Sequence, residues 1–178
     1  MSHPTEPRPA KLVIRFLFSD FQVQRSALEA LVSDFGPMDF LSMPGDFPYT
    51  TYYDDEMGHG IRRQTAGFVN LVAQGALPDL KLRTNEIEAR FLQNGKRQIN
   101  IDPGILNVER LVLATGKNFT HRIYLREGIY ADLTLMYHKG AYRPLPWTYP
   151  DYREPEFLHQ LEVLRKKLRF EQEGIFPK

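Results

Sequence analysis

Four polar side chains with chemical potential crowd the start of one strongly patterned segment of the chain. Lys117, Asn118, His121 and Arg122 lie just before or at the beginning of the alternating segment 119–138. Lysine and arginine supply positive charge, and an arginine can hold a carboxylate or a phosphate through two parallel hydrogen bonds. We therefore take these four residues as the first candidates for contacts with an anionic ligand. The second candidates are Asn85, Asp102, Tyr124 and Trp147.

Each of the leading candidates also has a purely structural explanation. Arg122 can form a cross-strand ion pair with Asp132, and Lys117 can be a solvated lysine in a turn. His121 lies between two apolar residues, where a histidine is usually a partly buried structural residue. To act as a general acid or base it would need a partner within hydrogen-bond reach. The sequence leaves both interpretations open.

The short string Ala114–Asn118 resembles the end of a phosphate-binding loop but lacks two of its essential residues. Such a loop needs a glycine five residues before the glycine of its Gly-Lys pair, and a serine or threonine after the lysine. Leu111 and Asn118 occupy those places. The chain also contains no Gly-x-Gly-x-x-Gly pattern for a dinucleotide and no Gly-x-Ser-x-Gly pattern for an acyl-transfer serine. The sequence therefore leaves any cofactor unknown.

Metal ligands are poorly supported by the spacing of the residues. There are no cysteines, and no two of the five histidines are two or four residues apart. The acidic run 54–56 with His59 can meet a hard divalent ion, but such a run more often begins and caps a helix. Asp102 can form a carboxylate pair with Glu86 or Glu88 if the fold brings them together. We predict no metal site.

Composition places the chain among ordinary globular proteins. It has 178 residues, of which 42% are hydrophobic and 25% are charged, which suits one domain. The net charge of +1 gives no general attraction to nucleic acid, so it does not point to nucleic-acid binding and does not exclude it. The lack of cysteine fits a reducing cytoplasm, and no apolar run has the roughly 20 residues that span a bilayer. We expect a cytoplasmic protein that does not cross a membrane.

The elements that must position the candidate residues follow from periodicity and turn residues. Residues 1–10 contain three prolines and are expected to be a flexible tail, not a signal peptide, before a single domain over 11–178. The further elements expected from the N-terminal half are a buried strand over 11–18, a helix capped by Asp20 that ends at Gly36-Pro37, a strand over 38–43, a long loop over 44–59 and a helix over 61–73.

The second half of the chain predicts a sheet followed by a final helix. Segment 78–93 has both helical and strand features, and the capping spacing of Asn85 and Glu88 favours a helix. We expect strands over 98–101 and 111–114, separated by a turn at Asp102-Pro103-Gly104. A helix begins near Glu154, with an apolar stripe and a basic last turn. The fold class is α+β, with a largely antiparallel or mixed sheet, a C-terminal meander around 119–143 and about four helices.

The alternating segment 119–138 predicts an antiparallel hairpin whose register can be read from its side chains. A two-residue loop at Glu127-Gly128 would place apolar Ile123 opposite Asp132. A three-residue loop over 126–128 instead pairs Arg122 with Asp132 and Tyr124 with Tyr130. Because a slip of one residue turns a whole strand over, we predict the second register.

Two loops combine aromatic and acidic residues. They cover 49–58 (YTTYYDDEMG) and 144–153 (PLPWTYPDYR). Rigid aromatic loops line ligand pockets and partner surfaces, and they also serve as hydrophobic lids over a core. For the second loop, with its single tryptophan between prolines, the sequence does not decide between these roles.

Several long segments resemble a known family. They are LRTNEIE (82–88), INIDPGIL (99–106), LVLATGKNFTHRIYL (111–125), GIYADLTLMY (128–137), PLPWTYPDYR (144–153) and YYDDEMG (52–58). Together they are similar to the family catalogued as domain of unknown function 4416, a group of small bacterial and archaeal proteins, over about 11–168. The resemblance implies a prokaryotic protein. Members are often labelled as GTP-binding proteins, and no family catalytic residues carry over.

The sequence thus predicts a protein that binds a small anionic ligand, for example a phosphorylated or nucleotide-like compound. Whether it also turns the ligand over is left open, as is its oligomeric state. The alternative is a non-catalytic interaction module that binds RNA or a protein partner through the basic C-terminal helix and the aromatic loops.

Overall fold

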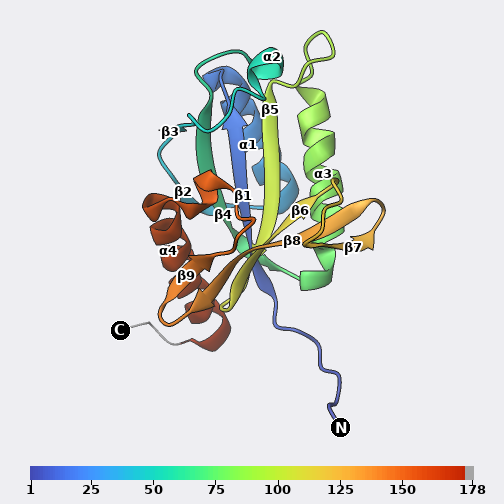
Figure 1. Cartoon of the computed structure of the whole chain (residues 1–178), viewed down its shortest axis with the longest axis vertical. Helices are drawn as coiled ribbons and strands as arrows, with labels where there is room; N and C mark the ends of the chain where they lie inside the picture. Colours follow the sequence, from blue (N-terminus) through green and yellow to red (C-terminus); the bar gives the residue numbers. More distant parts are fainter. Residues whose placement is uncertain (175–178) are drawn as a thin grey trace.

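The chain folds around one open antiparallel sheet, which the computed structural model describes for residues 1–174 (Figure 1). The strand order is β2-β4-β1-β5-β6-β8-β7, with β3 beside β4 and β9 beside β8. The strands are β1 (Ala10–Phe18), β2 (Met38–Leu41), β3 (Gly45–Asp46), β4 (Arg62–Val72), β5 (Ile99–Leu106), β6 (Arg110–Thr115), β7 (Arg122–Arg126), β8 (Ile129–His138) and β9 (Ala141–Pro144).

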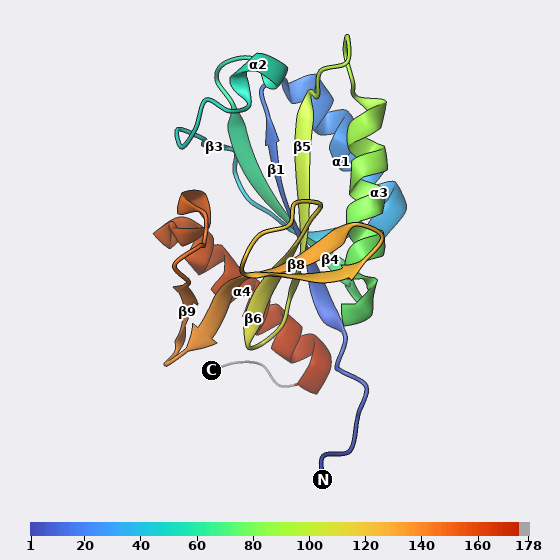
Figure 2. The same ribbon diagram turned by 45° about the vertical axis from the view of Figure 1, so that its right-hand side comes forward.

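Helices cover both faces of the sheet, as Figures 1 and 2 show from two directions. The helices are α1 (Phe21–Phe35), α2 (Asp54–Met57), α3 (Leu77–Arg90) and α4 (Pro155–Glu173), with short 3-10 turns η1 (Gln74–Ala76) and η2 (Pro150–Arg153). The α+β class and the largely antiparallel sheet are as predicted, and so is the number of helices, although α2 lies in a predicted loop and one predicted helix is a strand.

Strand β1 lies at the centre, and all nine of its residues are buried. Alternate residues of a strand point to opposite faces. Ile14 packs in the core with α1 and α3, whereas Val13 packs in a second core with α4. Leu17 belongs to a third, smaller cluster with Met57 of α2. The odd-numbered residues of β1 therefore face α4 and α2, and Arg15 is one of them.

The predicted helix over 61–73 is wrong, because this segment is the long strand β4. Its middle residues, from Gln64 to Phe68, are all buried between β1 and β2. A strand that is buried on both faces loses the alternation by which strands are recognised. Packing against α4 explains the glycine in this strand. A Cβ atom at Gly67 would lie only 2.6 Å from Leu164 Cδ2 of α4.

The predicted turn at Asp102-Pro103-Gly104 is also wrong, because β5 continues straight through it. Ile101 directs its backbone N–H and C=O to α3, away from β1. Pro103, two residues later, has its backbone nitrogen on the same side, where β6 has not yet begun to pair. A proline is tolerated there because no ladder hydrogen bond is lost. The chain reverses instead after Asn107, whose N–H donates to Arg110 O.

The hairpin β7–β8 has the predicted register but not the predicted loop. Arg122 is opposite Asp132 and Tyr124 is opposite Tyr130. The loop, however, has two residues, Glu127 and Gly128, both with positive φ, and a bulge between Tyr124 and Arg126 corrects the register. The strand begins at Arg122, so the three residues 119–121 precede β7 instead of belonging to it.

Several other predicted elements are confirmed. Asp20 caps α1 by accepting a hydrogen bond from Gln22 N, and the segment 78–93 contains helix α3. The segment 44–59, predicted as one long loop, instead contains the short strand β3 and helix α2. Residues 1–9 form no helix or strand. No helix of the described residues is long and apolar enough to cross a membrane.

Candidate functional site

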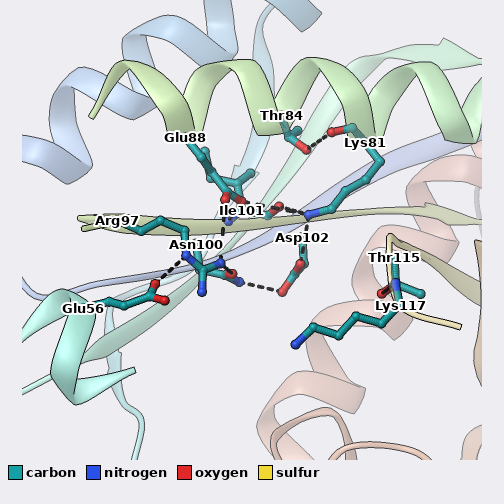
Figure 3. A network of polar contacts seen from close by, with 10 residues as sticks. All are labelled: Glu56, Lys81, Thr84, Glu88, Arg97, Asn100, Ile101, Asp102, Thr115 and Lys117. Carbon is teal, nitrogen blue, oxygen red and sulfur yellow. Dashed lines mark hydrogen bonds and ion pairs between the residues drawn. The ribbon is translucent and has the colours of Figure 1, made fainter. Parts of the chain in front are cut away.

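Part of one edge of strand β5 forms its hydrogen bonds with side chains instead of with a neighbouring strand. β5 pairs with β1 along its whole length but with β6 only over 104–106. At the open edge, Ile101 N donates to Glu88 Oε1 at 2.6 Å, and Lys81 Nζ donates to Ile101 O at 2.9 Å (Figure 3). Both side chains come from α3, so a helix supplies the donor and acceptor that a neighbouring strand would normally provide.

Lys81 also reaches round this edge to the face of β5 that lies opposite α3. Its Nζ is 3.3 Å from Asp102 Oδ1 and 3.9 Å from Glu88 Oε1. Asn100 donates to Asp102 Oδ2 at 2.8 Å and accepts from Arg97 at 3.0 Å. We call this group of charged and polar side chains the β5 cluster. Its members are Glu56, Lys81, Glu88, Arg97, Asn100, Asp102 and Lys117, and Figure 3 shows them together.

The buried carboxylate of the β5 cluster titrates near neutral pH. Burial raises the pKa of Glu88 to about 7, and the negative charge of Asp102 adds to the rise. The positive charge of Lys81 and the hydrogen bond from Ile101 N lower the pKa of Glu88, but by less than burial raises it. Glu88 can therefore hold or release a proton near pH 7, which an ordinary glutamate cannot do.

Lys117 differs from the other cations of the cluster because no carboxylate of the described residues pairs with it. Its backbone N–H donates to Thr115 Oγ1 at 3.2 Å, and its ammonium group lies 5.2 Å from the centre of the Tyr52 ring. In Figure 3 the side chain extends on the same side of β5 as Asp102. By contrast, Arg97 is held by Glu56 at 2.5 Å.

The aromatic loop before α2 contributes to this region. Tyr52 and Tyr53 pack edge to face with ring centres 5.0 Å apart, and Arg97 lies 5.8 Å from the Tyr53 ring. Burial, with the charge of Asp102, raises the pKa of Tyr53, so the phenol stays protonated at neutral pH. The loop therefore supplies neutral aromatic surface beside the charged groups.

A second polar group, which we call the hairpin clamp, ties the β7–β8 hairpin to the second aromatic loop. Its members are His121, Arg122, Asp132, Trp147 and Tyr149. Asp132 accepts from Arg122 Nε at 2.9 Å and lies 3.1 Å from His121 Nε2. Arg122 also donates to Lys117 O and to Tyr149 Oη, each at 2.9 Å. Trp147 stacks on His121 with ring centres 4.8 Å apart and donates to Leu133 O.

Comparison with known proteins adds a family to this geometry. The model of the family described as a domain of unknown function (DUF4416) matches residues 8–168. The chain belongs to this family. No curated protein and no solved structure matches the chain.

In this family member the predicted site residues fall into three places. Lys117 and Asp102 lie on the same side of β5 in the β5 cluster, while His121, Arg122 and Trp147 belong to the hairpin clamp. The remaining three, Asn85, Asn118 and Tyr124, are exposed and belong to neither group. In the clamp, Arg122 uses Nε and both terminal nitrogens on partners within the chain, which supports its structural interpretation.

Sequence reasoning missed most of the β5 cluster. As a functional group, Glu88 enters the sequence analysis as a possible carboxylate partner of Asp102, and the structure brings these two residues to the same ammonium group. Glu86 instead pairs with Arg83 on the surface of α3. The available signal was Lys81, Thr84 and Glu88 at helical spacing, which places three polar residues on the buried face of α3.

The acidic run of α2 does not form a cation site with its histidine. His59 Nδ1 lies 3.2 Å from Asp54 Oδ2, while Glu56 points to Arg97. Within residues 1–174 no group of three or more histidine, aspartate or glutamate side chains is arranged to hold a metal ion.

Proposed function

We propose that the protein binds a small anionic ligand beside β5, with Lys117 as the principal contact. The supporting observation is how the cations of the β5 cluster are paired. Lys81 and Arg97 pair with carboxylates, whereas the ammonium group of Lys117 contacts only the Tyr52 ring among the described residues. An unpaired ammonium group is available to a phosphate or a carboxylate as a point charge.

The balance of charge in the β5 cluster also favours an anion. Lys81, Arg97 and Lys117 face the three carboxylates of Glu56, Glu88 and Asp102. Because Glu88 is partly protonated near pH 7, the cluster carries a small net positive charge at that pH. A ligand with one or two negative charges would compensate it.

The neutral groups of the site suggest the chemistry of the rest of the ligand. Asp102 keeps 37% of its side-chain surface exposed, so its carboxylate can accept a hydrogen bond from a ligand O–H or N–H. Tyr52 offers a flat ring for stacking. Phosphorylated and nucleotide-like compounds combine these features and are the first classes to test. If the ligand is turned over, Glu88 is the group whose pKa suits a proton transfer.

The test is a thermal-shift screen with sugar phosphates and nucleotides, followed by calorimetric titration of each compound that stabilises the protein. We expect the variant Lys117→Gln to lose at least tenfold in affinity while it melts at the wild-type temperature. Lys166→Gln, which removes an exposed lysine of α4, is the matched control and should bind normally. Equal affinity in wild type and Lys117→Gln would exclude Lys117 as the contact.

The alternative function is binding to a macromolecular partner. The C-terminal helix is a weak RNA surface because three of its four clustered cations are engaged: Arg165 donates to Val108 O, Lys167 pairs with Asp39 and Arg169 pairs with Glu173. A protein partner is better supported, because the edge strand β7 exposes Ile123 and the preceding loop exposes Phe119. An interaction through these residues should survive high salt, whereas binding through phosphates should not.

A further inference from the structure

A buried arginine at the centre of the sheet has hydrogen-bond donors that the described residues leave unused. Arg15 lies in the middle of β1, and only 5% of its side chain is exposed. Its guanidinium group is 4.2 Å from the Phe157 ring centre and 4.8 Å from the Tyr152 ring centre. Nε lies 3.2 Å from Asp151 Oδ2, yet neither Nε nor Nη1 makes a hydrogen bond. Buried donors are normally satisfied, so this exception requires an explanation.

A second arginine lies on the neighbouring strand and shares a carboxylate with the first. Arg63 of β4 is opposite Leu17, two residues along β1 from Arg15. Its Nη2 forms a close ion pair with Glu154, and Tyr49 Oη donates to the same carboxylate. Arg15 Nη2 lies 4.0 Å from that carboxylate, which is too far for a hydrogen bond. The Glu154 side chain thus sits between two guanidinium groups but satisfies only one.

The carboxylate of Glu154 also lies at the beginning of helix α4. Glu154 is the residue before the first turn, and its side chain does not cap the helix. The free N–H groups at the start of a helix and the helix dipole favour negative charge. A crevice of about 10 Å³, the space of one water molecule, opens here between Arg15, Arg63 and Gln160.

We propose that this crevice is a second anion site, specific for a phosphate or carboxylate group, which the protein's own Glu154 fills when no ligand is present. Glu154 stays 4.0 Å from Arg15 Nη2 in the structure, whereas a free oxyanion can contact both arginines and the first turn of α4. The crevice is too small for a phosphate beside Glu154, so that side chain must turn outward. It is 23% exposed, which leaves it a route to solvent.

This inference is independent of the proposed ligand site, because it uses none of the residues of the β5 cluster. The experiment is a calorimetric titration with inorganic phosphate, and separately with acetate, at constant ionic strength. Glu154→Gln keeps the size of the side chain and removes its charge. We expect this variant to bind one of the two anions at least tenfold more tightly than the wild type, and the double variant Glu154→Gln/Arg63→Gln to lose that gain.

Two further measurements keep the test decisive. If Glu154→Gln folds poorly, phosphate is titrated into ¹⁵N-labelled wild type, where the amide signals of Glu156 and Phe157 in the first turn of α4 should shift. Lys117→Gln separates the two sites and should leave these shifts unchanged. Unchanged affinity in Glu154→Gln, or unshifted amides in the wild type, would overturn the proposal. Loss of the Glu154→Gln gain in the double variant Glu154→Gln/Lys117→Gln would overturn it as well, by assigning that gain to the β5 cluster.

Discussion

The hairpin clamp and the β5 cluster are two polar networks of similar size, yet their donors and acceptors are satisfied to different degrees. In the clamp, Arg122 has three partners within the chain, and Asp132 accepts from Arg122 and contacts His121. In the β5 cluster, Lys117 has no ion pair among the described residues. Glu88 is buried without full compensation, as the raised pKa shows.

This difference separates a structural network from the network that we propose to bind a ligand. A buried network in which every group is satisfied makes a fold rigid and specific, and it has little left to offer a ligand. A network with an unpaired cation and a carboxylate that titrates near pH 7 can still bind a charged ligand or transfer a proton. Both networks contain residues that the sequence singled out, so residue type alone could not distinguish them.

The largest expected effect is the loss of the carboxylate at the centre of the clamp. Asp132→Ala leaves the Arg122 guanidinium, whose side chain is nearly buried, without its counter-charge. Removing one partner of a buried ion pair costs about 3–5 kcal/mol. We expect a loss of that size in the free energy of unfolding, measured by urea denaturation. Asp79→Ala, which breaks the exposed pair with Arg126, is the control and should be indistinguishable from wild type.

Should Asp132→Ala unfold at the wild-type urea concentration, the clamp would not be the structural network that its hydrogen bonds indicate. Its residues would then return to the list of candidate ligand contacts. The assignment of His121 and Arg122 to structure therefore depends directly on this variant.

The next effect concerns Glu88 and the dependence of stability on pH. The pKa of Glu88 is about 7 in the folded protein and 4.5 when it is unperturbed. Between these values the folded state binds more protons than the unfolded state, so the contribution of Glu88 makes stability fall as pH rises from 4.5 to 7. The full change is about 3 kcal/mol. The contribution becomes constant only about one pH unit above the folded pKa, where Glu88 is ionised in both states.

Glu88→Gln, which cannot titrate, should lack this fall. We expect the difference in unfolding free energy, variant minus wild type, to rise by about 3 kcal/mol between pH 4.5 and 7. Other buried carboxylates with raised pKa values, such as Asp151, cancel in the difference. Glu86→Gln on the exposed side of α3 is the control. A flat difference curve for Glu88→Gln would mean that the carboxylate is fully compensated, and the contrast with the clamp would disappear.

The parts of the molecule that were predictable from the sequence depend on short-range patterns. The register of β7 and β8 follows from alternation across one hairpin, which brought Arg122 and Asp132 together correctly. The cap of α1 by Asp20 depends on a residue only two positions from its partner. In such cases the interacting residues lie within one local pattern that packing elsewhere does not change.

The errors and omissions come from contacts between distant residues. The strand character of β4 depends on burial from both sides, including the packing of Leu164 against Gly67. The turn residues of β5 adopt a strand because β1 pairs with them. The hydrogen bond from Lys81 to Ile101 O joins a helical side chain to a backbone atom 20 residues away. No pattern within one element contains that information.

The smallest expected effect tests how Lys117 is kept available. Its ammonium group lies 5.2 Å from the Tyr52 ring, a contact that orients the lysine without neutralising it. Such a contact at an exposed position contributes about 0.5–1 kcal/mol. Tyr52→Leu should therefore weaken binding of an anionic ligand by roughly two- to fivefold and leave the urea midpoint unchanged. Tyr124→Leu, which replaces an exposed tyrosine on β7, should affect neither quantity. If Tyr52→Leu lowered stability instead of affinity, the β5 cluster would behave like the clamp, and Lys117 would be a structural residue.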